Sequence, residues 1–333
     1  MKAIFLCEKT DKIFRVYNKE TVNALKLLTG IEEKVYTKAD VLGDPSRFAD
    51  VEIAFSTWGM PKFTEEEIKN VFPSLKCLFY GAGTVQQFAR PFLGCGVKVF
   101  SAWAANAVPV AEMTVAQIIL ANKGYFLTSR VFREKGSAAA NQLFAKCRGN
   151  YGETVGIIGA GMIGKLVIEM LKSYNLKVLV FDPFLPDEKA EALGVEKCDL
   201  STLFESSFVV SNHLANNAQT VGMLNYELFS KMRENSVFIN TGRGAQVVED
   251  DLVRVLGERA DITALLDVTY PEPPVENHPF YTLPNCILTP HIAGSAGDEV
   301  ARMGEYMLFE FKSYLSGEPT KYEVTEKMLE TMA

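Results

Sequence analysis

The sequence predicts an α/β protein with two domains, each built on a parallel β-sheet that helices cover on both faces. Short apolar runs rich in β-branched residues alternate with helical segments along the chain, the pattern of parallel strands joined by helices. A glycine-rich loop joins one such strand to a helix within 155–172. The length of 333 residues is long for one domain and sufficient for two.

The first hundred residues repeat strand, loop and helix. The expected strands are 3–7, 51–55, 75–80 and 97–100. A helix is expected over 19–29, with Asn18 as its N-cap and Gly30 just beyond its end. Another helix is expected after Thr64, because Glu67 three residues later completes a capping-box pattern. These elements predict a small parallel sheet with helices on its faces.

The remaining residues continue the alternation. A long helix is expected over 108–121, followed by one or two helices and a connection over 122–150. Further strands are expected at 155–158, 178–181, 208–212, 236–240, 262–267 and 287–288. Further helices are expected at 165–172, 188–193, 200–205, 226–232, 249–258 and 298–315.

The motif around which the chain is organised is G-x-G-x-x-G, formed by Gly159, Gly161 and Gly164. The first glycine allows a tight turn, the second lets a pyrophosphate approach the backbone, and the third lets the helix pack closely. The N-terminus of that helix offers N–H groups to phosphates. Asp182 ends the next strand, where a carboxylate can bind the hydroxyls of an adenosine ribose. This context predicts a dinucleotide-binding Rossmann domain. The alternatives are a methyltransferase loop and a glycine turn needed only for packing.

A second glycine loop, Gly81-Ala82-Gly83, follows the strand 75–80. It resembles 159–161, but Gln86 stands where the third glycine would be. The loop is therefore a poor dinucleotide loop and a plausible site for a smaller anion.

Three polar residues follow strands outside the fingerprint: Arg243 after 236–240, Glu272 after 262–267, and His291 after 287–288. In an open parallel sheet the carboxyl ends of the strands line the ligand crevice. An arginine there can hold a carboxylate and polarise a carbonyl, and a histidine can exchange a proton with a hydroxyl. A glutamate can orient the imidazole. The alternatives are a loop-bracing arginine, an exposed glutamate and a histidine bonded to a backbone carbonyl.

Composition limits the other classes of function. The net charge of −7 argues against binding to nucleic acid. Six scattered cysteines without a C-x-x-C pair indicate buried thiols in a reducing, cytoplasmic setting, with no metal site. No stretch is expected to span a membrane, because the apolar region 108–121 contains Glu112 and Gln117.

Together these motifs resemble the D-isomer-specific 2-hydroxyacid dehydrogenases, which include formate dehydrogenase, phosphoglycerate dehydrogenase and glyoxylate/hydroxypyruvate reductase. Matching segments run from about Tyr80 to Ser295. The resemblance implies an NAD-binding Rossmann domain over 105–297 and a smaller flavodoxin-like substrate domain formed by 1–104 and 298–333. It also implies a homodimer with a contact through 107–150.

The activity implied is hydride transfer between NAD(H) and a pair of small acids, a 2-keto acid and a D-2-hydroxy acid. Arg243 would bind the substrate, Glu272 would be the partner of His291, and His291 would donate the proton. The expected cofactor-binding residues are Gly159, Gly161, Met162, Ile163, Gly164, Asp182, His213, Thr241, Gly242 and Asp267, of which Asp267 would bind the nicotinamide carboxamide. The expected substrate-binding residues are Ala82, Gly83, Asn106 and Arg243.

Two questions stay open at this level. An NAD(H)-sensing, corepressor-like binding protein of the same fold would keep the same residues, and a panel of 2-keto acids would separate it from an enzyme. His213 and His278 are interpreted as structural or as residues at the edge of the cofactor site. Trp58 and Trp103 either shape a substrate pocket or pack in the core.

Overall fold

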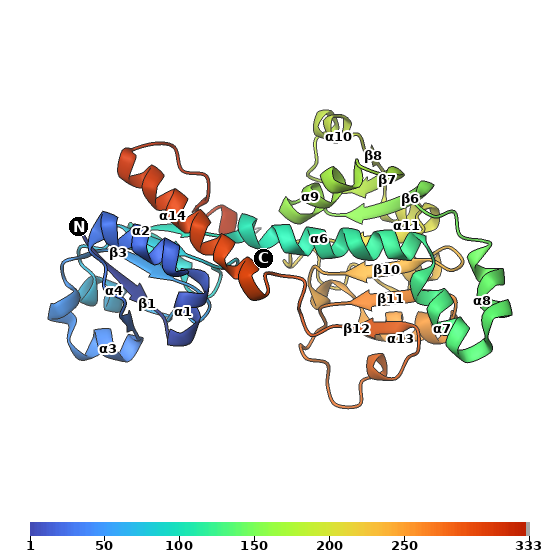
Figure 1. Cartoon of the computed structure of the whole chain (residues 1–333), viewed down its shortest axis with the longest axis horizontal. Coiled ribbons are helices and arrows are strands. Elements are labelled where there is room, and N and C mark those ends of the chain that lie inside the picture. Colours follow the sequence, from blue (N-terminus) through green and yellow to red (C-terminus); the bar gives the residue numbers. More distant parts are fainter. Residues whose placement is uncertain (331–333) are drawn as a thin grey trace. The chain divides into compact units, whose positions relative to one another are not determined.

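The computed structural model describes residues 1–330, which divide into two compact units. The first comprises Met1–Asn106 and the chain from Ser295 onward, and the second comprises Ala107–Gly294. The sequence places the corresponding boundaries at 104 and 297. The first division falls within α6 (Trp103–Asn122), the long helix drawn in Figure 1. Each unit is an α/β structure around its own sheet, which confirms the predicted fold class.

The sheet of the first unit has six strands in the order β13-β5-β4-β3-β1-β2. Their bounds are β1 (Lys2–Leu6), β2 (Val35–Tyr36), β3 (Val51–Ser56), β4 (Cys77–Tyr80), β5 (Lys98–Ser101) and β13 (Glu323–Val324). The five strands from the N-terminal segment are parallel in the flavodoxin-like order 2-1-3-4-5. The edge strand β13 is antiparallel to β5, an addition that the sequence pattern did not indicate.

The helices of the first unit are α1 (Thr10–Val16), α2 (Lys19–Thr29), α3 (Lys38–Gly43), α4 (Glu65–Val71), α5 (Ala89–Gly94) and α14 (Ala301–Ser316). Short 3-10 turns are η1 (Pro45–Phe48), η4 (Gly297–Val300) and η5 (Met328–Glu330). The predicted caps are confirmed: Asn18 accepts from the Thr21 N–H, Gly30 is left-handed, and Thr64 forms a capping box with Glu67. The short elements α1, β2 and α3 were not predicted, because they carry too few residues for a clear period.

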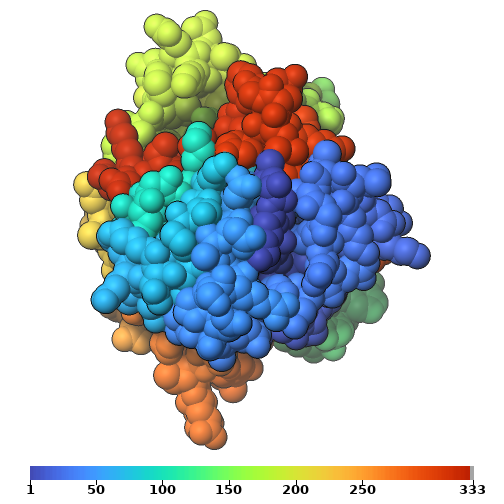
Figure 2. All heavy atoms as spheres, turned by 90° about the vertical axis from the view of Figure 1, so that its left-hand side faces the viewer, coloured from blue at the N-terminus to red at the C-terminus, as the bar shows by residue number. Residues whose placement is uncertain are grey.

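The C-terminal helix α14 completes the core of the first unit. The ring of Phe311 packs edge to face on Phe55 and Phe79, each at 5.3 Å between centroids, and Phe79 stacks on Phe100 at 4.6 Å. A Cβ on Gly304 would lie 2.2 Å from the Val16 carbonyl oxygen, so only glycine allows this approach of α14 to α1. Figure 2 shows α14, in red, beside the dark blue N-terminal segment.

The sheet of the second unit has seven parallel strands in the order β12-β11-β10-β9-β6-β7-β8. Their bounds are β6 (Tyr151–Ile158), β7 (Asn175–Phe181), β8 (Glu196–Lys197), β9 (Val209–Asn212), β10 (Val237–Asn240), β11 (Thr263–Leu266) and β12 (Cys286–Leu288). The chain adds strands on one side of β6 and then on the other, so the order reverses between β6 and β9. Such a switch point is where ligands bind in open parallel sheets.

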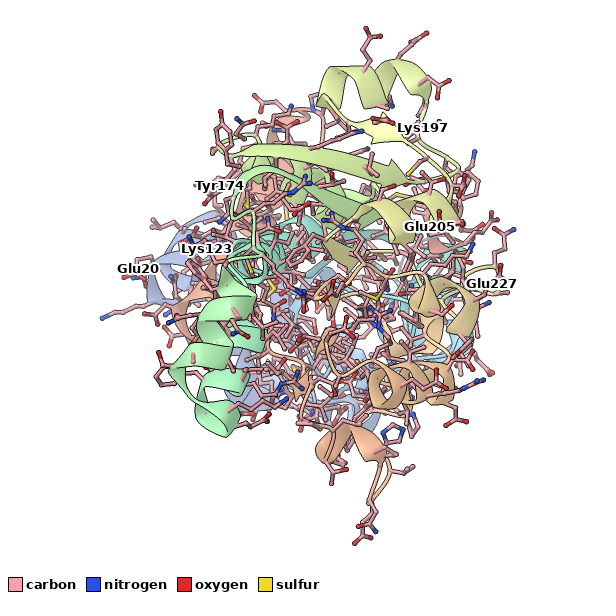
Figure 3. All side chains as sticks on the ribbon, turned by 90° about the vertical axis from the view of Figure 1, so that its right-hand side faces the viewer. Glu20, Lys123, Tyr174, Lys197, Glu205 and Glu227 are labelled. Atoms are coloured by element: carbon pink, nitrogen blue, oxygen red, sulfur yellow. The ribbon has the colours of Figure 1, made fainter. Side chains whose placement is uncertain are left out.

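Two apolar clusters cover the two faces of this sheet. One joins alternate strand residues, such as Ile157 and Ile239, to α6, α9 (Met162–Leu171) and α10 (Asp187–Leu193). The other joins residues such as Ile158 and Phe238 to α11 (Leu200–Ser206), α12 (Tyr226–Ser230) and α13 (Glu249–Glu258). Figure 3 shows Lys197, Glu205 and Glu227 at the periphery, so the charged side chains of β8, α11 and α12 point away from the core.

Two further helices, α7 (Tyr125–Lys135) and α8 (Ser137–Phe144), fill 122–150 as expected. The helix expected over 108–121 is longer at both ends and includes Pro109. Within the described residues, α6 passes the test of length and composition for a helix that could cross a membrane, although no such stretch was expected from the sequence. Half of that apolar window is buried, and core helices pass the same test, so the signal is weak.

Candidate functional site

The fingerprint loop has the backbone geometry that its glycines predict. Gly159 has φ +90°, and a Cβ there would lie 2.9 Å from the His213 carbonyl oxygen. A Cβ on Gly164 would lie 2.0 Å from the Gly159 carbonyl oxygen, so the first turn of α9 packs directly on the loop. A Cβ on Gly161 would meet nothing within 4 Å. The open space faces the start of α9, which has no side-chain cap and can bind a phosphate.

Asp182 follows β7 and braces this loop. Its Oδ2 accepts a hydrogen bond of 2.7 Å from the Ala160 N–H, and its Oδ1 accepts one of 2.8 Å from the Phe184 N–H. The carboxylate thus lies beside the glycine turn at the carboxyl end of β7. Its predicted contact with a ribose stays a prediction.

A network of amides, missed in the sequence analysis, positions the Arg243 loop. Asn212 and Asn240 are paired in register at the ends of β9 and β10. The Asn212 Nδ2 donates to the Asn240 Oδ1 at 3.0 Å and to the Gln246 Oε1 at 2.6 Å. The Asn240 Nδ2 donates to the Arg243 carbonyl oxygen at 3.1 Å. Two asparagines that end adjacent buried strands were the available signal, because a buried amide needs partners.

Arg243 itself is half-buried and makes no ion pair with the described residues. Its Nη1 donates to the Gly242 carbonyl oxygen at 2.7 Å. Burial lowers the pKa of the guanidinium, while the nearby charge of Glu272 opposes this effect. Arginine stays protonated in proteins, so Arg243 presents a partly desolvated cation that can bind a carboxylate.

His291 and Glu272 meet across two loops of the second unit. The His291 Nδ1 lies 2.6 Å from the Glu272 Oε1, and both side chains are partly exposed, at 46% and 40%. With Nδ1 held by the carboxylate, Nε2 is the ring nitrogen left to exchange a proton. The structure therefore brings together two of the three residues that the sequence singled out from distant segments.

Asp267 holds the loop that carries His291. The residue is 3% exposed, and its carboxylate accepts from the Thr289 Oγ1 at 2.6 Å, the Ile292 N–H at 2.9 Å and the Ala293 N–H at 2.9 Å. The His291 N–H donates to the Asp267 carbonyl oxygen at 3.0 Å. The structure thus shows a positioning role that the sequence did not indicate, and the predicted carboxamide contact stays a prediction.

The other histidines differ in their surroundings. His213 is 8% exposed, its Nε2 lies 2.9 Å from the Ser211 Oγ, and burial lowers its pKa to about 3. Its buried Nδ1 has no partner among the described residues, a donor or acceptor left for a ligand beside the fingerprint loop. His278 accepts from the Phe280 N–H at 3.3 Å and caps η3 (Pro279–Tyr281), a structural role.

Thr241, another expected cofactor residue, contacts the Thr114 hydroxyl of α6 at 3.1 Å between oxygens. Met162, the first residue of α9, is 45% exposed. Within the described part of the chain, no group of three or more His, Cys, Asp or Glu residues is arranged to hold a metal ion.

In the first unit, some backbone groups of the loop at 81–83 form hydrogen bonds with neighbouring residues, and others have no partner among the described residues. The Ser101 Oγ donates to the Ala82 carbonyl oxygen at 2.9 Å, and the Ala82 N–H donates to the Tyr80 carbonyl oxygen at 2.8 Å. The N–H groups of Gly83 and Thr84 have no partner within residues 1–330. Of the two expected loop residues, Gly83 therefore presents a free donor, and Ala82 does not.

Asn106 lies near the same loop. Its Oδ1 accepts from the Ser295 N–H at 3.0 Å, and a Cβ on Gly83 would lie 4.0 Å from its Nδ2. A cavity of about 580 Å³ adjoins the loop, because Tyr80 and Thr84 on either side of it are among the lining residues. Trp58 also lines this cavity, whereas Trp103 packs edge to face on Tyr322 at 5.5 Å between centroids.

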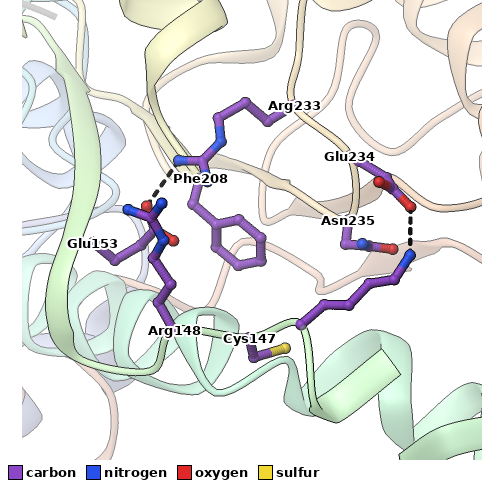
Figure 4. A pocket seen from close by; sticks show the side chains of 8 residues that line it. Cys147, Arg148, Glu153, Phe208, Arg233, Glu234 and Asn235 are labelled. Atoms are coloured by element: carbon purple, nitrogen blue, oxygen red, sulfur yellow. Dashed lines mark hydrogen bonds and ion pairs between the residues drawn. The ribbon is translucent and has the colours of Figure 1, made fainter. Parts of the chain in front are cut away.

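A second cavity of about 360 Å³ lies in the second unit, at the amino ends of β6, β9 and β10 (Figure 4). Four of its five charged side chains form two ion pairs: Arg233 contacts the buried Glu153 at 2.7 Å, and Lys146 contacts Glu234 at 3.1 Å. It lies at the amino ends of the strands, whereas the fingerprint loop lies at the carboxyl end of β6, so this cavity is not the dinucleotide site.

Known proteins resemble this chain in both sequence and fold. Residues 115–293 match the family model "D-isomer specific 2-hydroxyacid dehydrogenase, NAD binding domain". The chain is 34% identical over 204 residues to YoaD of Bacillus subtilis, covering 60% of this chain and 58% of the relative. It is 31% identical over 211 residues to the hydroxypyruvate reductase of Thermotoga maritima, covering 63% and 67%. It spans 44% and 42% of the next two curated relatives after YoaD.

Among solved structures, a phosphoglycerate oxidoreductase from Rhizobium etli superposes with a TM-score of 0.80 at 22% identity, covering 98% of this chain and 99% of the other. At this identity the likeness shows the fold alone. The likeness in fold covers both units.

Proposed function

The chain belongs to the D-isomer specific 2-hydroxyacid dehydrogenase family, and we propose that it interconverts a 2-keto acid and a D-2-hydroxy acid with NAD(H). The observation that carries this proposal is the 2.6 Å contact between His291 and Glu272, in the unit that matches the NAD-binding domain. The open space at Gly161, the uncapped start of α9 and the unpartnered Nδ1 of His213 fit a bound dinucleotide. The cofactor supplies the hydride.

The protein's own residues supply binding and proton transfer in this proposal. Arg243 binds the substrate carboxylate and polarises the carbonyl, because it is a cation without an ion-pair partner among residues 1–330. The free N–H of Gly83 and the amide of Asn106 add substrate contacts. His291 donates a proton from Nε2 to the forming alkoxide, and Glu272 holds the ring through Nδ1. General acid catalysis of this kind contributes roughly 10²–10⁴-fold.

We further propose a preference for NAD, since Asp182 presents a carboxylate that would repel a 2′-phosphate. We also propose a homodimer formed through α6–α8, because Leu120, Tyr125, Phe132 and Phe144 are exposed there. The six free thiols fit a cytoplasmic protein.

The test is a screen of NADH oxidation over glyoxylate, pyruvate, hydroxypyruvate and bulkier 2-keto acids. We expect turnover of at least one substrate, with His291→Ala depressed in both directions and NADH binding retained. Tight NADH binding without turnover of any 2-keto acid would refute the enzyme and support an NAD(H)-sensing protein.

A further inference from the structure

A cluster of three cations, Lys9, Lys12 and Arg15, lines the cavity of the first unit. Lys9 is the N-cap residue of α1, and Lys12 and Arg15 follow at intervals of three. Residues three and four apart lie on one face of a helix, which explains why these side chains and Val16 line the same cavity.

The charges of this cluster are not neutralised by the protein. None of the three side chains forms a hydrogen bond or ion pair within residues 1–330, and no Asp or Glu is among the lining residues of the cavity. The protein as a whole carries a net charge of −7, and in the other cavity two of the three lining cations, Lys146 and Arg233, are paired with carboxylates. Three unpaired cations therefore line this cavity and no carboxylate does, although Glu8 and Asp11 lie in the same segment of the chain, and this lining favours an anionic ligand.

The same cavity has apolar walls. Trp58, Met60, Tyr80 and Phe88 line it, and the last three of these side chains are buried. Its volume of about 580 Å³ lies within the range of roughly 300–1,000 Å³ that small-molecule sites occupy. Tyr80 and Thr84 flank the glycine loop that would hold the substrate carboxylate. The cations thus lie around a cavity next to that loop, where the far end of a substrate would reach.

We propose that the substrate is a 2-keto acid whose side chain ends in a second anionic group, which Lys9, Lys12 and Arg15 bind. This inference rests on the proposed function and adds the substrate class. The shared chemistry is an anionic terminus, carboxylate or phosphate, carried on a side chain that lies against Trp58 and its neighbours. A carboxylate or phosphate gains charge-assisted hydrogen bonds there that an uncharged end group cannot form.

The test compares substrates with the same number of carbon atoms, one with an anionic terminus and one without. The pairs are 2-oxoglutarate and 2-oxopentanoate for a carboxylate, and phosphohydroxypyruvate and hydroxypyruvate for a phosphate. We expect a higher kcat/KM for the anionic member of at least one pair, and the pair that shows it identifies the end group. The ratio of kcat/KM for the anionic member to kcat/KM for the uncharged member of that pair should fall roughly 10-fold to 100-fold in Lys12→Ala and in Arg15→Ala. This is the cost of one charge-assisted hydrogen bond.

Matched controls separate binding from folding. Lys19→Ala removes an exposed, unpaired lysine from the same unit outside the cavity and should leave the ratio unchanged. Lys12→Arg should restore most of the ratio, because it keeps the charge. Added salt should lower the ratio in the parent protein more than in Lys12→Ala, since exposed charges are screened.

The outcomes also separate this inference from the proposed function. Equal kcat/KM for both members of both pairs would overturn the inference while leaving the dehydrogenase activity established. If no 2-keto acid is reduced, the proposed function fails, and fluorescence of Trp58 in a Trp103→Phe background tests the site directly. Quenching by 2-oxoglutarate or phosphohydroxypyruvate but by neither uncharged partner, lost in Lys12→Ala, would support the anion site. No difference between the members of either pair would overturn it.

Discussion

Asp267→Asn is the substitution that most directly tests how the His291 loop is held. The carboxylate accepts three hydrogen bonds from Thr289, Ile292 and Ala293, and the residue is 3% exposed. An asparagine keeps one oxygen and places an NH2 donor against one of these donors, so one charge-assisted bond is lost. Such a bond contributes about 1.5–3 kcal/mol. The two remaining bonds become neutral and weaker. We expect the free energy of unfolding to fall by about 2–4 kcal/mol.

The activity should fall as well, because the loop carries the proton donor. A misplacement of about 1 Å can cost roughly 100-fold in rate, and we expect a loss of that order in kcat/KM for Asp267→Asn. Thr289→Val removes one of the three bonds without changing the carboxylate, so it should lower kcat while the Kd for NADH stays near the parent value. Denaturant unfolding and steady-state kinetics provide the two measurements.

Asp250→Asn is the matched control, since Asp250 is exposed on α13 and makes no hydrogen bond or ion pair with its side chain within residues 1–330. It should leave stability and kcat/KM unchanged. If Asp267→Asn unfolds at the same denaturant concentration as the parent and keeps its kcat/KM, Asp267 does not hold the His291 loop, and the reasoning from these three bonds is wrong.

Three further predictions concern charge. Glu272→Gln removes the carboxylate that lies 2.6 Å from the His291 Nδ1, so kcat should fall in both directions while NADH binding is retained; a kcat equal to the parent's would exclude Glu272 as the partner. Asp182→Ala should narrow the preference for NADH over NADPH measured as kcat/KM, and a parent enzyme that prefers NADPH would contradict the role of this carboxylate. Burial lowers the pKa of His213 to about 3, so the unfolded chain binds a proton that the folded chain does not between pH 6.5 and 3. The free energy of unfolding should therefore fall by about 1.4 kcal/mol for each unit by which the pH decreases in that range, and less steeply in His213→Gln. Denaturation midpoints measured at successively lower pH would show this.

The fold class and the positions of the long elements could be predicted from the sequence. Apolar periodicity reports which face of an element is buried, and the caps at Asn18 and Thr64 depend on residues three apart. The short elements escaped prediction, because β2 and β13 have two residues each and carry no period. The place of β13 depends on its antiparallel pairing with β5, more than 200 residues away, which no local pattern encodes.

For the candidate site, the sequence by itself determined the glycine spacing and the residue types at the strand ends, Arg243, Glu272 and His291. These are local properties, since a glycine's permitted φ and a strand's carboxyl end follow from neighbouring residues. Only the tertiary structure decided that Glu272 meets His291, that Asp267 holds the loop that carries His291, and that the cations of α1 face the same cavity as Trp58. Such contacts join distant segments, and they form because burying the shared apolar core brings those segments together.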